Sequence, residues 1–269
     1  MVSRAAVPLA LAAVLLAVPL AWAGCGAGVG KPPLVLAASG DLEGSGILEA
    51  WARDFQERSG RRVEVVTDTD DHVCDMARHG ECDLILTHVP SDEESLERAG
   101  YVTDRREIMR GGYLLVGPSG DPAGAREAEE VTEALKRIAE ARQPFVLRVD
   151  GSGTAIRASS LWGGSGVEET GDWLVETREG AEEALRLASA RGAYTLVGRD
   201  TYERLAGELD METIQDAGEA MEDSYHAMVV STLTYPDTDT AGALEFTSYL
   251  LSENGQGFLE LGRYMPPSR

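Results

Sequence analysis

The chain has 269 residues, with 46 acidic and 24 basic side chains and a formal net charge of −22 at pH 7. Such an acidic surface repels polyanions, which argues against nucleic acid and anionic membranes as partners. The length is large for one compact domain and suits two lobes of roughly 110 to 130 residues each.

Residues 1–24 have the features of an export signal peptide. Arg4 precedes a long apolar run, and small residues follow at Ala23-Gly-Cys25. Cleavage before Gly24 would release the protein, whereas a lipobox reading places a lipid on Cys25. We favour the lipoprotein, with residues 25–31 as a flexible tether. A retained transmembrane anchor is the third alternative. Each of these places the folded part outside the cytoplasm, in the periplasm or at the cell surface.

Strands and helices alternate through the first part of the chain. Short apolar runs predict buried strands at 34–37, 63–66 and 83–87. Apolar residues at helical spacing predict a helix that Gly60 ends, and a shorter helix should run to about His79. This alternation predicts a mainly parallel sheet with helices on both faces, which binds ligands beyond the carboxyl ends of its strands. The loops at 38–45 and 67–71 lie at those ends.

The later part of the chain repeats the alternation after a turn-rich linker at 117–124. We expect helices at 127–141, 179–191, 241–251 and 255–261, and strands at 109–118, 145–147, 193–197 and 227–230. The predicted fold is therefore α/β with two lobes. Lobe I comprises residues 32–112 and 221–269, and lobe II comprises residues 113–220. No later segment is apolar for long enough to span a bilayer.

The segment from Arg148 to Thr154 predicts an anion site. Its glycines allow a tight turn, and Ser152 stands where a helix N-cap should be. Free N–H groups at a helix start attract anions, and a guanidinium such as that of Arg148 binds oxyanions with two parallel hydrogen bonds. Taken alone, the segment also fits a capped turn with a surface arginine.

Cys74 and Cys82 remain as a pair if Cys25 carries lipid. In an oxidising compartment we expect a disulfide between them. Unlinked thiols are one alternative, and a metal site with nearby histidines is another. The spacings His72-x-Cys74 and His79-x-x-Cys82 do not match a zinc finger, so no metal site is predicted.

In the order and spacing of its segments, the chain resembles the extracytoplasmic tungstate- or molybdate-binding components of ABC transporters, within the two-lobed periplasmic-binding-protein class. The resemblance covers nearly the whole predicted mature chain and includes Gly80-x-x-Asp83, Asp121-Pro-Ala123 and Arg148-x-Asp-x-Ser-Gly-Thr154. It implies a tetrahedral oxyanion between the lobes, an ABC permease as partner and no cofactor. The ligand-binding residues that it implies are Ser39, Thr69, Arg148, Ser152, Gly153, Thr154 and Thr195.

The first two loops depart from the pattern of that family. Where the family has hydroxyls or glycines, this chain has Ala38-Ser-Gly-Asp41 and Asp68-Thr-Asp70, and Ala155 replaces a histidine. A unit charge about 4 Å from another costs on the order of 4 kcal/mol at an effective dielectric constant near 20, and a dianion is affected about twice as strongly. The carboxylates could point to solvent, pair with an arginine, or form an acidic pocket for a cationic or other ligand from Asp41, Asp68 and Asp70. A diverged sensor lipoprotein is the matching alternative function.

No arrangement of nucleophile and base predicts an enzyme. Gly-x-Ser-x-Gly and His-Glu-x-x-His are absent, and no histidine stands beside a serine in a catalytic frame. His88, at a strand end, is interpreted as a core residue. We therefore expect a monomeric binding protein without catalytic residues, which touches the membrane only through a lipid at Cys25.

Overall fold

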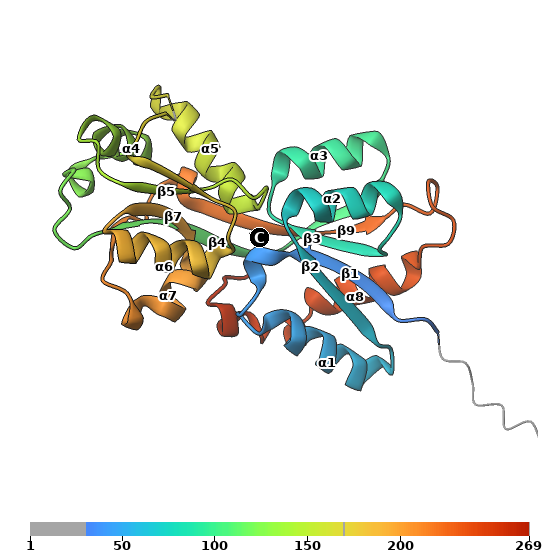
Figure 1. The fold of residues 1–269 in the computed structure, drawn as a ribbon. Helices are drawn as coiled ribbons and strands as arrows, with labels where there is room; N and C mark the ends of the chain where they lie inside the picture. The colour runs from blue at the N-terminus through green and yellow to red at the C-terminus, as the bar shows by residue number, and fades with distance from the viewer. Residues whose placement is uncertain (1–30, 169, 269) are drawn as a thin grey trace, which may run out of the picture. The chain divides into compact units, whose positions relative to one another are not determined.

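The computed structural model describes residues 31–168 and 170–268 (Figure 1). The predicted signal peptide and Cys25 lie outside the described residues, as does all but the last residue of the predicted tether. Pro32–Arg269 form one compact unit. Within the described ranges, no helix is both long and apolar enough to cross a membrane.

The first sheet has the strand order β2-β1-β3-β9-β4. Its strands are β1 (Leu34–Ser39), β2 (Val63–Asp68), β3 (Leu84–Thr87), β9 (Glu222–Val230) and the first part of β4 (Val102–Gly117). β1 pairs in parallel with β2 and β3, whereas β9 runs antiparallel to β3 and β4. The apolar run of β1 is buried because helices cover both faces of the sheet.

Helices α1 (Ile47–Ser59) and α8 (Thr240–Leu250) cover one face of this sheet, and α2 (Asp70–His79) and α3 (Pro90–Ala99) cover the other (Figure 1). Trp51 and Phe55 of α1 pack with Phe246 of α8 in the core of the first face. α1 ends at Gly60, whose φ of 71° is readily adopted only by glycine. Helix α9 (Glu253–Gln256) follows α8.

The second sheet continues from β4 in the order β4-β7-β5-β6, with β8 also paired to β4. Its strands are β5 (Phe145–Arg148), β6 (Leu174–Thr177), β7 (Tyr194–Gly198) and β8 (Glu212–Gln215). Helices α4 (Val131–Glu140) and α5 (Gly153–Ser165) pack on one face, and α6 (Ala181–Arg191) and α7 (Arg199–Leu205) on the other. The predicted α/β class is confirmed, with parallel strands in each sheet and antiparallel pairing at β4 and β9.

Strand β4 joins the two sheets and positions the site. Its residues up to Gly112 pair with β9, and from Tyr113 onward they pair with β7. The carboxyl ends of β1 and β2 and the start of α5 therefore meet beside the middle of β4 (Figure 1). The boundaries of the two lobes stay a prediction.

The predicted disulfide between Cys74 and Cys82 is wrong, because both cysteines are free in the structure. Both side chains lie in the apolar cluster between the first sheet and its helices α2 and α3. Burial raises the pKa of each thiol to about 12, which disfavours the thiolate that disulfide formation requires.

Alkylation of the denatured, unreduced protein tests the state of these thiols. We expect mass spectrometry to find the peptides of Cys74 and Cys82 each carrying the alkyl group, in amounts equal to those in a reduced control. A disulfide-linked pair of peptides would contradict the structure at this point.

Candidate functional site

The start of helix α5 is the centre of the site. Ser152 is its N-cap and accepts a hydrogen bond from the backbone N–H of Ala155. Gly151 before it has a φ of 83°. A Cβ atom on Gly153 would lie 2.1 Å from Nε2 of His88, so glycine is needed here for the close approach of the imidazole. The local sequence thus presents free N–H groups toward the first sheet, as expected for an anion site.

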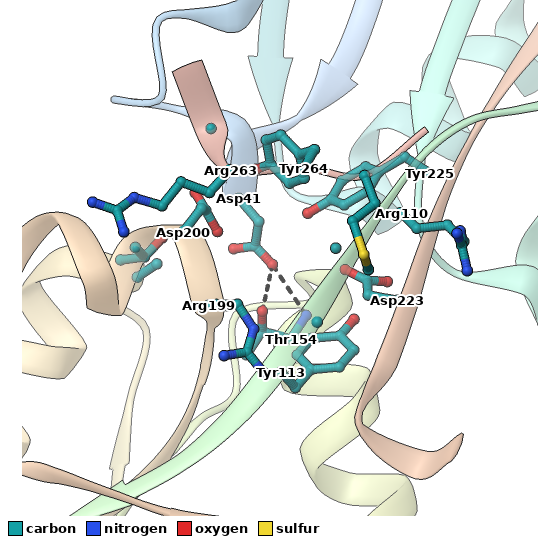
Figure 2. Close-up of a pocket in the computed structure, with 17 residues that line it drawn as sticks. Asp41, Arg110, Tyr113, Thr154, Arg199, Asp200, Asp223, Tyr225, Arg263 and Tyr264 are labelled. Carbon is teal, nitrogen blue, oxygen red and sulfur yellow. Dashed lines mark hydrogen bonds between the residues drawn. The ribbon is translucent and has the colours of Figure 1, made fainter. Parts of the chain in front are cut away.

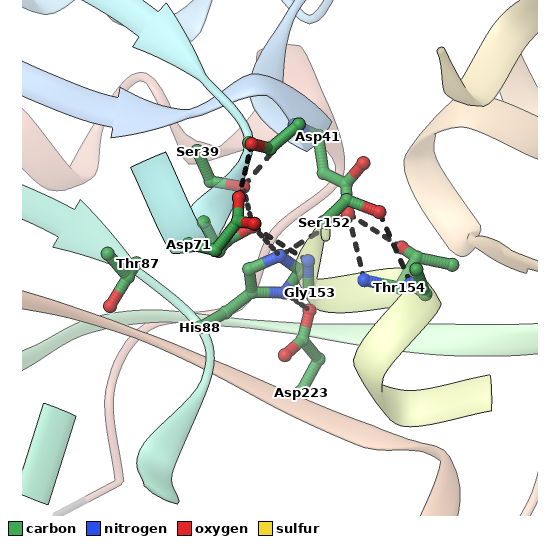
Figure 3. Close-up of polar contacts among 12 residues, drawn as sticks. Ser39, Asp41, Asp71, Thr87, His88, Ser152, Gly153, Thr154 and Asp223 are labelled. Atoms are coloured by element: carbon green, nitrogen blue, oxygen red, sulfur yellow. Dashed lines mark hydrogen bonds and ion pairs between the residues drawn. The ribbon is translucent and has the colours of Figure 1, made fainter. Parts of the chain in front are cut away.

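The carboxylate of Asp41 occupies these donors (Figure 3). Arg148 donates to it from Nη1 at 2.7 Å, and Thr154 donates from its backbone N at 3.1 Å and from Oγ1 at 2.7 Å. Asp41 lies in a 3₁₀ turn after β1, and its own N–H is capped by Ser39. Burial by itself would raise the pKa of Asp41, but the charges of Arg148 and His88 and their hydrogen bonds hold it far below its usual value.

Asp70, the first residue of α2, brings a second carboxylate to the same helix start. It accepts a hydrogen bond from Oγ of Ser39 at 2.8 Å and from the backbone N of Gly153 at 2.7 Å. Its side chain is fully buried, and its Oδ1 has no hydrogen-bond partner. Two carboxylates from the first sheet therefore satisfy donors that the second sheet supplies.

His88 lies between these carboxylates. Its Nε2 is 3.4 Å from Oδ2 of both Asp41 and Asp70, and its Nδ1 donates to Asp223 at 2.8 Å. Its ring stacks on Tyr225 with centroids 4.4 Å apart. Burial would lower the pKa of His88, but the surrounding charges, that of Asp223 first, raise it well above the usual value. The surrounding carboxylates therefore favour the protonated form of His88.

Negative charge is in excess in this buried network. Among its described members, four carboxylates face two cationic groups: Asp41, Asp70, Asp150 and Asp223 against Arg148 and His88. Asp150 is the second partner of Arg148 at 2.5 Å. The network therefore holds together the two sheets but leaves part of its charge uncompensated.

The structure brings most of the sequence-predicted ligand residues together. Five of them contact the carboxylates of Asp41 and Asp70 or the neighbouring Asp150. They are Ser39, Arg148, Ser152, Gly153 and Thr154. Thr69 instead donates to Asp71 near the surface, and Thr195 donates to the carbonyl of Val146 within the second sheet, at 2.9 Å. Their roles in ligand binding stay a prediction.

Sequence reasoning did not identify several members of the network. His88 was expected to be a core residue, and Asp150, Tyr113 and Asp223 were not singled out. Asp150 had a usable signal, because Arg148-x-Asp150 at the end of one strand places both side chains beyond the same sheet edge. Asp223 and Tyr113 approach His88 only through the pairing of β9 and β4, which no local pattern shows.

A cavity of about 260 Å³ adjoins the network on the side of α7 and β9 (Figure 2). Asp41 and Thr154 form part of its wall, so it shares these residues with the network. A wider hollow of about 490 Å³ opens on the side of Arg148 and Asp150. Solvent and small solutes can therefore approach the Asp41 carboxylate from two directions.

Asp200, at the start of α7, lines the smaller cavity. Burial raises the pKa of its carboxyl to about 6 from an ordinary 3.8. Ionisation is thus harder in the folded state than in the unfolded state, so this group makes stability fall as the pH rises from about 4 to 6, and the loss stays constant at higher pH.

Asp200→Asn removes this titration. The free energy of unfolding of this variant, relative to that of the native chain, should increase as the pH rises from 4 to 7. The increase should be at most about 3 kcal/mol, because one pKa unit corresponds to about 1.4 kcal/mol. Urea unfolding at several pH values measures the difference. Stability curves that stay parallel would show that Asp200 ionises as freely in the folded chain as in the unfolded one.

Comparison with known proteins gives a family match. The family model for the PBP superfamily domain matches residues 27–254. A Haloferax volcanii protein, named for anion binding by an ABC transporter, is 31% identical over 228 residues, which are 83% of this chain and 67% of that protein. The tungstate-binding protein TupA of Peptoclostridium acidaminophilum is 28% identical over 231 residues, 85% of this chain and 81% of TupA.

Solved structures agree with this match. The tungstate-binding protein TupA from Desulfovibrio alaskensis G20 superimposes with a TM-score of 0.77 at 25% identity, covering 88% of this chain and 100% of that one. The structure described as the tungstate ABC transporter from Geobacter sulfurreducens has a TM-score of 0.76 at 26% identity, covering 86% and 98%.

Proposed function

The chain belongs to the PBP superfamily, and from that premise we propose that it is the exported solute-binding component of an ABC transporter. Its ligand is a small tetrahedral oxyanion, tungstate or molybdate, captured at the start of α5. The names of its relatives support this proposal, since they are binding proteins for tungstate or for anions. The protein acts as a carrier and not as an enzyme, and it needs no cofactor.

One observation carries the choice of an anion. The guanidinium of Arg148 and the N–H and hydroxyl groups of Gly153 and Thr154 already hold oxygen atoms of carboxylates, at 2.7 to 3.1 Å. A carboxylate is itself an oxyanion, and the lowered pKa of Asp41 supports the view that these donors favour negative charge. The same donors suit the oxygen atoms of a tetrahedral anion.

Binding of an external oxyanion requires the Asp41 side chain to leave. Asp41 acts as an internal competitor, and the wider hollow beside Arg148 gives the ligand an approach and the carboxylate an exit. The apparent affinity is then reduced by the fraction of molecules in which Asp41 holds the donors. Bridges from Asp41 to Arg148 and Thr154 also join the two sheets, so ligand exchange is coupled to their separation.

The acidic-pocket alternative has less geometric support. The Asp68 side chain is 46% exposed and pairs with His72, while both oxygens of Asp41 and Oδ2 of Asp70 accept hydrogen bonds. The remaining elements of the proposal are an ABC permease as partner, export followed by lipid attachment at Cys25, and a monomeric state.

Calorimetry on the purified protein tests the function. Tungstate, molybdate, sulfate, phosphate and calcium are titrated separately at fixed ionic strength. We expect saturable binding of tungstate or molybdate, and weaker binding of the other ions. Saturable binding of calcium with no response to any oxyanion would favour the acidic pocket instead.

A further inference from the structure

The cavity of about 260 Å³ holds hydrogen-bonding atoms that nothing in the network satisfies. Among the described residues, Oδ1 of Asp223 has no hydrogen-bond partner, although this side chain is only 5% exposed. The Asp200 carboxyl, 7% exposed, interacts with the hydroxyl of Tyr264, and its Oδ2 lies 4.0 Å from Nη2 of Arg204, beyond hydrogen-bonding distance. Buried acceptors that lack donors are costly, so these two carboxyl groups point to a missing ligand that donates hydrogen bonds.

Aromatic rings form the other walls of this cavity (Figure 2). The rings of Tyr225 and Tyr264 meet edge to face, with centroids 5.6 Å apart and planes at 73°, and Tyr113 lines the side nearer α5. Faces of tyrosine rings carry negative potential and attract cations. Tyrosine rings beside carboxylates can bind a cation, and here His88 already stacks on Tyr225 while Arg157 lies over Tyr113.

The arginines at the rim do not cancel this negative character. Arg263 pairs with Glu203 at 2.7 Å. Arg199 pairs with Glu203 and Asp216, and Arg110 donates to the carbonyl of Pro266. Their charges are therefore directed to partners outside the cavity, while Asp200 and Asp223 line it, with one oxygen of Asp223 paired with His88.

We propose that this cavity binds a small primary ammonium ion, whose N–H groups donate to Asp200, Asp223 and the hydroxyl of Tyr264. A primary ammonium has three N–H donors, one for each of these three oxygen-bearing groups. A metal ion fits less well, because aromatic walls offer it no ligands. The volume equals that of about nine water molecules, which suits an amine with a short carbon chain packed against the tyrosine rings. The three proposed acceptors are not among the donors that would hold the oxyanion, although Asp41 and Thr154 also line this cavity.

Calorimetry with four probes tests the chemistry of this ligand. They are propylammonium, propyltrimethylammonium, 1-propanol and potassium, each as a titrant into the whole protein at constant ionic strength. We expect propylammonium to bind at least tenfold more tightly than propyltrimethylammonium, which lacks N–H donors, and the other two to show no saturable binding. Equal binding of the two ammonium ions, or no binding of propylammonium at millimolar concentration, would overturn the proposal.

Three variants test whether propylammonium binds in this cavity. Asp200→Asn and Asp223→Asn should each weaken propylammonium binding at least tenfold, and Tyr264→Phe about threefold or more, since each removes one acceptor. Asp210→Asn removes the same charge from an exposed position that does not line the cavity and should leave affinity within twofold. Asp223 also pairs with His88, so Asp223→Asn could disturb the fold. In that case Asp200→Asn and Tyr264→Phe alone show whether propylammonium binds in this cavity.

Unchanged affinity in both of these variants would place the amine elsewhere. Tungstate titrated in parallel keeps the two sites distinguishable. If oxyanion binding persists while propylammonium fails to bind, the amine site alone is refuted, and the reverse result refutes only the proposed function.

Discussion

The Asp41→Ser variant is expected to bind tungstate at least 100-fold more tightly than the native chain. In the native structure, an incoming oxyanion must break the hydrogen bonds of Asp41 with Arg148 and Thr154. Each hydrogen bond to a charged group contributes about 1.5–3 kcal/mol, and a factor of 100 requires only about 2.7 kcal/mol. Serine frees the donors, removes a negative charge and adds a hydroxyl.

Calorimetry on Asp41→Ser and on a matched control measures this effect. Asp68→Ser makes the same change of charge on the neighbouring loop, where the side chain is exposed, and should alter the affinity less than threefold. If Asp41→Ser weakens oxyanion binding, Asp41 is part of the ligand site and not its competitor.

Arg148→Ala is expected to abolish oxyanion binding and to destabilise the protein by about 3–5 kcal/mol. The guanidinium is buried and pairs with Asp41 at 2.7 Å and with Asp150 at 2.5 Å. Its removal leaves Asp150 without its cation and Asp41 with only His88, at 3.4 Å, and breaking a buried ion pair from one side carries a penalty of this size.

Urea unfolding at pH 7 and tungstate calorimetry measure the two consequences of Arg148→Ala. Arg148→Lys should recover part of the stability but little of the binding, because an ammonium cannot donate two parallel hydrogen bonds. Arg186→Ala removes an arginine that is 45% exposed and should change stability by less than about 1 kcal/mol. A native-like affinity in Arg148→Ala would remove this residue from the oxyanion site.

Much of the fold follows from local patterns in the sequence. Continuous apolar runs identified β1 and β5, and helical spacing of apolar residues ended by glycine identified α1 and α6. Helix α3 has few apolar residues and buries mainly Leu96, so periodicity does not reveal it. Helix α7, which begins at Arg199, was not among the predicted helices, and Asp200 in its first turn lines the cavity.

The candidate site was predicted in part, for a physical reason. The anion-binding donors lie in one segment, Arg148 to Thr154, whose turn and cap residues define its conformation. What occupies them depends on distant residues, since Asp41 and Asp70 reach the start of α5 only through the packing of the two sheets. From the sequence, pairing with an arginine was one of three possibilities for the carboxylates of the first two loops. The structure shows this pairing for Asp41, with Arg148.

A crystal structure of the protein with tungstate tests the central claim most directly, because tungsten scatters anomalously and can be located without ambiguity. We predict a tungsten peak beside the start of α5, with anion oxygens that accept hydrogen bonds from Arg148 and Thr154 and with the Asp41 side chain displaced toward the hollow. Crystals at saturating tungstate in which Asp41 still holds Arg148 and Thr154, with no tungsten beside them, would contradict the account.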